Sequence, residues 1–303
     1  MKLIIKNMIQ LKKIKKLYRS SRCIRFLMYP AMIVYKYIEN YKIRIKQEVI
    51  ENLKKIVINE PIINVPNFYG KFQINIKSDL FSRTIIDGNY EKDLTEAIAQ
   101  YINIEKDAID VGANIGFYSI LLANKIGKAQ RVLSIEPSES IVKRLRHNIH
   151  LNNLSDKVIV YEGGAADNAG MKQLNLIEGR EEYSSMGRLC HPSTHGSHVK
   201  SCQVATNSID ALVNDNNLRV GFMKIDVEGY EYQVIEGSKN TLKEHRPIIL
   251  SELCDPLLRE NGSSSKEVIA KIRSYGYTII DPLHHGRLPG SVDYCDILCI
   301  PIS

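Results

Sequence analysis

The sequence lacks several features that would place it in common protein classes. Its six cysteines form no Cys-x-x-Cys pair, and Cys295 and Cys299 lie in an apolar run, so we expect structural thiols in a reducing compartment. No apolar run reaches the ~18–20 residues that cross a bilayer. The N-terminus is basic but has no apolar core or cleavage site of a signal peptide, which predicts a cytoplasmic protein.

Basic residues are scarce in most of the chain and concentrated at its start. Residues 1–60 hold 15 Lys and Arg against 4 Asp and Glu, a net charge of +11, whereas the rest of the chain holds 26 against 30, a net charge of −4. An acidic body argues against a nucleic-acid groove. The sequence also has no aromatic clamp of the Asn-Pro-Pro-Tyr type, so we expect no nucleic-acid partner.

Residues 1–60 are expected to form basic helices in which Lys and Arg alternate with Leu, Ile and Tyr. The apolar stretch "FLMYPAMIVYKYI" (Phe26 to Ile38) is too short to span a membrane, and Lys36 interrupts it. Two interpretations stay open. Residues 1–46 hold the protein on the inner face of an anionic membrane or on a partner, or the segment packs on the body as a helical cap or dimer contact. The oligomeric state is not determined by the sequence.

The main domain, residues 61–303, shows strands and helices in alternation from Asp107 onward. Such alternation is typical of an open, mostly parallel α/β sheet. Helices are expected after Gly116, after Ser138, over "YEYQVIEGSKNTLKE" and after Ser264. The predicted strands are Asp107–Gly112, Arg131–Glu136, Val158–Glu162, Val220–Asp226, Pro247–Glu252, Tyr277–Asp281 and Asp296–Pro301.

Residues 170–210 break this alternation because they are polar, rich in Ser, Gly and His, and show no clear helix. Insertions near the carboxyl ends of parallel strands commonly build substrate sites, so we expect a substrate-facing insertion here. His191, His195 and His198 fall inside it. They are interpreted as solvated loop residues, with substrate contact or a zinc site as alternatives.

A glycine-rich loop, "DVGANIG", follows the first predicted strand. Gly112, Asn114 and Gly116 keep the loop compact where a ligand must approach the backbone. Glu136 ends the next strand, where a carboxylate suits a ribose diol. Asp110 immediately precedes the loop and would repel a pyrophosphate but attract an ammonium or sulfonium group. The combination predicts S-adenosylmethionine as the cofactor rather than a nicotinamide dinucleotide.

The segment "KIDVEGYE" closes the fourth strand of the predicted sheet. Asp226 and Glu228 are two residues apart, so on an extended strand end their side chains would point the same way. A carboxylate here could accept the proton of a hydroxyl group that attacks a methyl donor. The alternatives are a divalent metal site, which is not favoured, and a structural role in which Asp226 caps a helix and Glu228 pairs with Lys224.

Several motifs, in order, resemble the FkbM-type family of S-adenosylmethionine-dependent methyltransferases over about residues 80–282. They are "YEKDL", "DVGANIGFYS", "HNIHLNN", "KIDVEGYE" and "RPIILSE". The resemblance implies a class I, Rossmann-like methyltransferase fold with a seven-stranded, mostly parallel sheet whose last strand is antiparallel. It also implies O-methylation, frequently of sugar hydroxyls.

The resemblance further implies roles for individual residues. Glu91 would lie near the methionine end of the cofactor, Asp110 to Gly116 around it, and Glu136 on its ribose. Gly164 and Ala165 would contact adenine through their backbone, because the acidic residue found here in many relatives is absent. The substrate-facing residues would be Tyr90, Ser184, Ser185 and Arg188.

Together these features predict an S-adenosylmethionine-dependent O-methyltransferase that acts on a sugar hydroxyl of a glycan, glycoside or glycolipid. One alternative is methylation of another hydroxyl, on a small metabolite or a lipid. A further alternative is an inactive methyltransferase domain that binds a membrane or a partner; the intact glycine loop, Glu136 and the Asp226 and Glu228 pair argue against it. The sequence does not identify the acceptor or the methylated position.

Overall fold

A computed structural model describes residues 37, 40–52, 55, 60–87, 90–177, 183–187, 199–283 and 293–302. The chain forms two compact units, residues 1–57 and residues 58–303. In the first unit, residues 40–52 are helical. Among the described residues, no helix is both long and apolar enough to cross a membrane.

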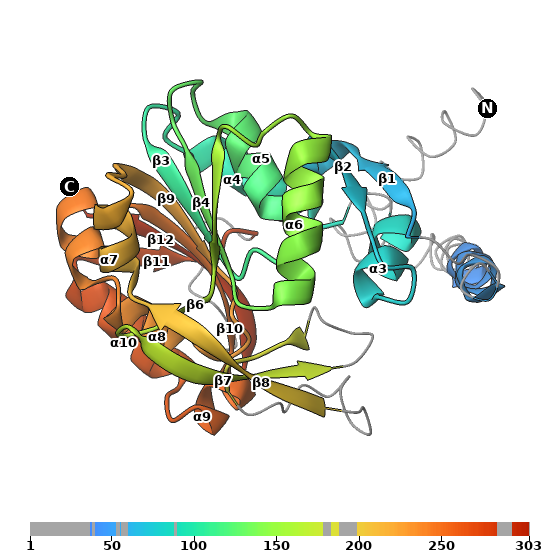
Figure 1. Cartoon of the computed structure of the whole chain (residues 1–303). Coiled ribbons are helices and arrows are strands. Elements are labelled where there is room, and N and C mark those ends of the chain that lie inside the picture. Colours follow the sequence, from blue (N-terminus) through green and yellow to red (C-terminus); the bar gives the residue numbers. More distant parts are fainter. Residues whose placement is uncertain are drawn as a thin grey trace, which may run out of the picture. The chain divides into compact units, whose positions relative to one another are not determined.

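Within the described part of the second unit, seven strands form one large sheet (Figure 1). Their order across the sheet is β11, β12, β10, β9, β3, β4, β5. Neighbouring strands from β10 to β5 are parallel, whereas β12, the last strand of the chain, is antiparallel to β10 and β11. The strands are β3 (Asp107–Val111), β4 (Val132–Glu136), β5 (Val158–Glu162), β9 (Val220–Ile225), β10 (Ile248–Cys254), β11 (Tyr277–Ile280) and β12 (Tyr294–Pro301).

This sheet confirms the predicted class I fold. All residues of β3, β4 and β9 are buried, which is why these strands appear in the sequence as near-continuous apolar runs. On β12, Cys299 is buried and Cys295 is half-buried, both as free thiols. The carboxyl ends of the parallel strands meet at one edge of the sheet, where α/β proteins of this kind bind their ligands.

Helices cover both faces of the sheet, with α4, α5 and α6 on one side and α7, α8 and α10 on the other (Figure 1). Ser264 caps α10 as expected, because its hydroxyl accepts from the Glu267 amide. Ser138 precedes α6, but its side chain makes no capping bond. The helices are α3 (Asp79–Asp87), α4 (Lys92–Tyr101), α5 (Phe117–Lys125), α6 (Glu139–Leu151), α7 (Ile209–Asp215), α8 (Glu231–Glu236), α9 (Asp255–Glu260) and α10 (Ser265–Ser274).

The single helix expected over "YEYQVIEGSKNTLKE" is wrong, because α8 already ends at Glu236. A Cβ atom on Gly237 would lie 2.0 Å from the Ala166 carbonyl oxygen, so only glycine fits at this position. The Asp210 carboxylate then accepts from the amides of Asn240 and Thr241 at 2.9 and 2.8 Å. These bonds precede a separate π-helical turn, Thr241–His245.

The predicted insertion contains strands that the sequence did not indicate. The strands β6 (Gly164–Ala165), β7 (Gly170–Ile177) and β8 (Val199–Asn207) form a second, three-stranded sheet. Most of β8 is exposed, so its sequence shows no alternation of apolar and polar residues. Arg188, His191, His195 and His198 lie outside the described residues.

A short hairpin, also missed by the sequence analysis, precedes the large sheet in the chain. It consists of β1 (Ile62–Val65) and β2 (Gly70–Gln73), joined by a 3-10 turn at Pro66–Phe68. Asn148 of α6 ties the hairpin to the main domain, because its side-chain oxygen accepts from the Gln73 amide at 2.8 Å and its side-chain nitrogen donates to the Ile115 carbonyl at 2.9 Å. The hairpin thereby packs beside the helix that follows the glycine loop.

Candidate active site

The site lies where β3 and β9 run side by side and the strand order reverses. Val111 pairs with Ile225 in the parallel register, and the Asp226 amide donates to the Val111 carbonyl at 3.0 Å. Gly112 follows with a φ of 78°, and a Cβ atom on it would lie 1.8 Å from the Asp226 carbonyl oxygen. The glycine loop and the segment that carries the predicted catalytic pair therefore touch through their backbones.

An inner cavity opens beside the glycine loop, with about 870 Å³ of empty space including its mouth. Six of the residues predicted to bind the cofactor line this cavity, namely Glu91, Gly112, Asn114, Glu136, Gly164 and Ala165. Gly116 is not among the lining residues; it begins α5 with a φ of 98° and packs against Leu145.

Glu136 is buried and joins two loops at the cavity wall. Its Oε2 accepts from the Asn114 amide and its Oε1 from the Ser138 amide, both at 2.9 Å. Burial raises the pKa of Glu136 to about 7, although these two hydrogen bonds favour the charged form. Each carboxylate oxygen still has a free lone pair for a further donor, such as a hydroxyl group.

Asp110 lies behind the cavity rather than in its wall. Its side chain is fully buried, its Oδ2 accepts from the Ser119 hydroxyl at 2.6 Å, and its Oδ1 has no hydrogen-bond partner among the described residues. Burial raises the pKa of Asp110, and the nearby Lys224 ammonium opposes that shift. The structure therefore places Asp110 beneath Lys224 and not in direct reach of a ligand in the cavity, contrary to the expectation from the sequence.

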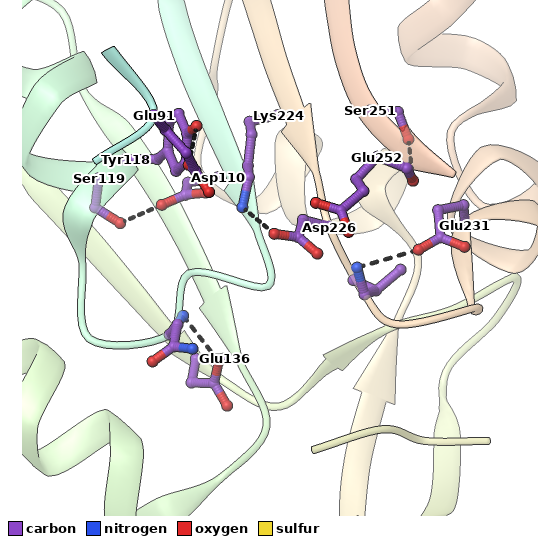
Figure 2. A network of polar contacts seen from close by, with 12 residues as sticks. Glu91, Asp110, Tyr118, Ser119, Glu136, Lys224, Asp226, Glu231, Ser251 and Glu252 are labelled. Atoms are coloured by element: carbon purple, nitrogen blue, oxygen red, sulfur yellow. Dashed lines mark hydrogen bonds and ion pairs between the residues drawn. The ribbon is translucent and has the colours of Figure 1, made fainter. Parts of the chain in front are cut away.

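Lys224 is a buried cation at the centre of the site (Figure 2). Its Nζ lies 3.0 Å from Asp226 Oδ2 and 4.6 Å from the centre of the Tyr118 ring. Burial lowers the pKa of Lys224, but Asp226 and Asp110 outweigh that effect and raise it above its ordinary value. Tyr118 in turn donates to Glu91 Oε2 at 2.6 Å, so these contacts link two of the predicted site carboxylates, Asp226 and Glu91, through Lys224 and Tyr118.

A second, outer cavity of about 1600 Å³, including its open mouth, adjoins the first. Both cavities share Tyr90, Glu91, Asn114, Asp226 and Glu228 as lining residues. The outer cavity is strongly acidic, because its wall holds seven carboxyl groups but only two cationic side chains. The acidic residues are Asp79, Glu91, Asp93, Asp226, Glu228, Glu252 and Asp296, and the cationic ones are Arg83 and Lys92.

The chain turns sharply after Asp226, so the extended geometry expected for the catalytic pair is wrong. Strand β9 ends at Ile225, and Glu228 has a φ of 51°. Glu231 holds this turn, because its Oε1 accepts from the amides of Val227 and Gly229, both at 3.2 Å. Asp226 and Glu228 nevertheless line the same two cavities.

The Glu228 carboxyl group lies among other acids. Burial, together with Asp226, Glu252 and Glu231, raises the pKa of Glu228 well above its ordinary value, and Lys224 opposes the shift. Glu252 and Asp296 face each other across β10 and β12. Burial and neighbouring carboxylates raise the pKa of Glu252 to about 8 and that of Asp296 to about 7. Around pH 7, Glu252 and Asp296 therefore hold protons that ordinary carboxyl groups have lost.

The predicted substrate residues divide into three groups. Tyr90 and Ser184 line the inner cavity. Ser185 lines neither cavity: it is buried, and its hydroxyl donates to the Glu228 carbonyl at 2.9 Å, so it supports the turn rather than facing an acceptor. Arg188 lies outside the described residues.

Sequence reasoning missed the central role of Lys224 and the presence of Glu252, Asp296 and Tyr294 in the outer cavity. A lysine inside the buried strand "VGFMKI" was the available signal, since a charged residue is rarely buried without a partner. One of the alternatives considered from the sequence was an ion pair between Lys224 and Glu228. In the structure, Lys224 instead forms its ion pair with Asp226. Among the described residues, no group of three or more His, Cys, Asp or Glu is arranged to hold a metal ion.

The sheet order, the glycine loop at the strand reversal and the carboxylates beside it define a class I methyltransferase. Comparison with known families agrees: residues 110–279 match the family described as Methyltransferase FkbM domain, and residues 34–173 match the one described as Protein-L-isoaspartate(D-aspartate) O-methyltransferase. Because the first match spans more than half of the chain, the protein belongs to the FkbM family of methyltransferases. No curated protein matches the sequence significantly.

Two solved structures illustrate the similarity. Methyltransferase FkbM from Methylobacillus flagellatus KT is 16% identical with a TM-score of 0.44, and the match covers 72% of this chain but only 52% of that one. An O-methyltransferase from Bacillus cereus, solved in complex with SAH, is also 16% identical with a TM-score of 0.40, and the match covers 85% of this chain and 98% of that one. This chain thus spans about half the length of the first of these proteins.

The residues of the inner cavity fit S-adenosylmethionine, the methyl donor of this class. The donor combines an adenine ring, a ribose diol, and ammonium and sulfonium cations. Glu136 offers acceptors for the diol, and Glu91 and Asp226 offer negative charge for the cations. Apolar side chains suited to a flat ring line the same cavity, namely Ile135, Ile141, Leu174 and Met186.

Proposed function

We propose that the protein is an O-methyltransferase that acts on a sugar hydroxyl of a glycan, glycoside or glycolipid. One observation carries this proposal: Asp226 and Glu228 line both the inner and the outer cavity. A carboxyl group at this boundary can contact an acceptor hydroxyl on one side while the cofactor occupies the other. S-adenosylmethionine, when bound, supplies an activated methyl group.

The two carboxyl groups take different parts in the proposed reaction. An acceptor hydroxyl that takes the methyl group must lose its proton, and Glu228 would receive that proton. Glu228 suits this role because its raised pKa makes it a stronger base than an ordinary carboxylate. Asp226, which Lys224 holds at 3.0 Å, accepts a hydrogen bond from a neighbouring hydroxyl group of the acceptor and so orients the sugar.

The lining of the outer cavity supports a polyhydroxylated acceptor. Carboxyl groups accept hydrogen bonds from several hydroxyls at once, and the rings of Tyr90, Tyr183 and Tyr294 offer flat surfaces for the faces of a sugar. The same acids disfavour an anionic acceptor, because neighbouring carboxylates already raise the pKa values of Glu228, Glu252 and Asp296, and a further negative charge would add to this repulsion. Methylation of a carboxylate, as the name of the second matching family describes for proteins, is therefore the weaker alternative.

Methyl transfer to defined acceptors tests this proposal. The purified protein would be incubated with S-adenosylmethionine and matched sets of neutral glycosides, uronic acids and peptides with free carboxylates, and the products would be analysed by mass spectrometry. We expect a methyl ether on the neutral glycosides, stable to mild alkali. An alkali-labile product formed only on carboxylate acceptors would contradict the proposal. A neutral small metabolite or lipid alcohol as the sole acceptor would favour the alternative hydroxyl acceptor.

A further inference from the structure

The described helix of the first unit exposes a stripe of apolar side chains. Tyr37, Tyr41, Ile45 and Val49 are 71%, 57%, 43% and 51% exposed. They are spaced four residues apart, so on a helix they lie on one face, one above the other. We call these four residues the Tyr37–Val49 stripe.

Cationic side chains border this stripe on both sides. At about 100° per residue, Arg44 falls along one border and Lys42 and Lys46 along the other. All three are exposed. Glu48 lies beside Arg44 on the helix surface and is also exposed. The arrangement is a narrow apolar face with Lys42 and Lys46 along one border and Arg44 beside Glu48 along the other. The aliphatic stems of the basic side chains can lie along an apolar surface while their charges reach outward.

We propose that the Tyr37–Val49 stripe binds the surface of an anionic phospholipid membrane. The apolar face inserts shallowly among the headgroups, and Lys42 and Arg44 contact lipid phosphates. The distribution of charge along the chain favours this partner. Residues 1–60 hold 15 Lys and Arg against 4 Asp and Glu, and the rest of the chain holds 26 against 30. Attraction to an anionic surface is therefore concentrated in the segment that carries the stripe.

A second copy of the chain is a less suitable occupant. Pairing two stripes would bring together two segments that each carry a net charge of +11 over residues 1–60, and the resulting repulsion opposes association. An anionic bilayer instead neutralises that charge. The proposal concerns a surface separate from the two cavities, so it stands independently of the proposed methyl transfer.

Co-sedimentation of the full-length protein with vesicles tests this inference. The vesicles are phosphatidylcholine alone, or phosphatidylcholine with about one third phosphatidylserine, at low and at high salt. We expect binding to the anionic vesicles at low salt, little binding to the neutral vesicles, and loss of binding at high salt, because salt screens the charges.

Two pairs of matched variants locate the binding surface. The stripe variant, Ile45→Asp with Val49→Asp, changes two of the four apolar residues of the stripe. Its control, Ile62→Asp with Ile104→Asp, changes two similarly exposed apolar residues of the second unit. The border variant, Lys42→Glu with Arg44→Glu, reverses two charges beside the stripe. Its control, Lys77→Glu with Lys128→Glu, makes the same charge change at exposed sites of the second unit. We expect the border variant to bind roughly thirtyfold more weakly, the stripe variant at least about tenfold more weakly, and each control to stay within about twofold.

Circular dichroism and thermal unfolding verify that each variant remains folded. The inference is wrong if the wild-type protein stays in the supernatant with anionic vesicles at low salt, or if the stripe and border variants bind as well as their controls. It is also wrong if the stripe variant converts a dimer to a monomer and vesicle binding is absent, because the stripe would then be a contact between copies of the chain.

Discussion

Lys224 and Asp226 form an ion pair of 3.0 Å in which the lysine side chain is 9% exposed and the aspartate side chain 33% exposed. The buried cation lines only the inner cavity, whereas its partner lines both cavities. This asymmetry gives the lysine a positioning role, because it sets the direction of a carboxylate that a bound acceptor can contact.

Replacing Lys224 by methionine tests this positioning role. The variant keeps the length of the side chain but leaves Asp226 without its partner, and we expect kcat to fall by about one hundredfold, as for a misplaced reacting group. The affinity for S-adenosylmethionine should change less than kcat. Lys128→Met, at an exposed lysine, serves as the control. A Lys224→Met variant that is folded and keeps the wild-type kcat would contradict the role.

Neutralising the catalytic pair separates proton transfer from cofactor binding. Glu228→Gln removes the proposed base, and we expect turnover to fall by on the order of 10²–10⁴ with little change in cofactor affinity. Asp226→Asn removes the orienting acceptor and should reduce turnover to a smaller extent. Full activity in both variants would exclude this pair from the chemistry, and inhibition by chelators that magnesium reverses would favour the metal alternative.

The pH dependence of kcat/KM should report the environment of Glu228. Its pKa is raised well above the ordinary value by burial and by Asp226, Glu252 and Glu231, while Lys224 opposes the shift. Activity requires the ionised base, so the rate should increase with pH and level off above the Glu228 pKa. Asp226→Asn removes a negative charge and should move this rise to lower pH. An unchanged or opposite shift in the residual activity of that variant would contradict the assignment.

Glu136 provides a test of the cofactor site. Glu136→Ala removes the acceptors predicted for the ribose diol, each charge-assisted bond contributing about 1.5–3 kcal/mol. We therefore expect S-adenosylmethionine to bind about tenfold to a hundredfold more weakly in a calorimetric titration. The alanine also frees the amides of Asn114 and Ser138, so thermal unfolding must show that the variant is folded. Unchanged affinity would remove the ribose assignment.

The same residue predicts how stability depends on pH. The pKa of Glu136 is about 7 in the folded protein and about 4.5 when unperturbed, so the folded state binds this proton more tightly. Its contribution to stability is fully present below pH ~4.5 and is lost as the pH rises through ~7. Between pH 7.5 and pH 5, the stability of the wild-type protein relative to Glu136→Gln should increase by about 2 kcal/mol. Urea unfolding at both pH values measures this difference, and a constant difference would contradict the raised pKa.

The fold was largely predictable because its central strands are buried on both faces. An apolar run followed by a glycine loop marks β3, and similar runs mark β4 and β9. The strands β7 and β8 were not predictable, because most of β8 and the start of β7 are exposed and their buried residues do not alternate regularly with exposed ones. Helix α8 was predicted too long because it ends just before Gly237, where the chain passes close to Ala166, a residue distant in the sequence.

The site was predictable in composition but not in orientation. From the sequence, Asp226, Glu228, Glu136 and the glycine loop could be expected to lie close together. All four lie at or just after the carboxyl ends of strands, which meet at one edge of the sheet. It could not show that Asp110 faces the interior or that Ser185 supports the Glu228 carbonyl, since both depend on neighbours from other parts of the chain.

The contact between Gly112 and the Asp226 carbonyl also has a thermodynamic consequence. A Cβ atom at position 112 would lie 1.8 Å from that oxygen, so neither segment can move toward the other. A ligand that pushes the glycine loop toward Asp226 must therefore displace Asp226 as well. Coupling of this kind is reciprocal: the factor by which bound cofactor changes the affinity for the acceptor equals the factor by which bound acceptor changes the affinity for the cofactor.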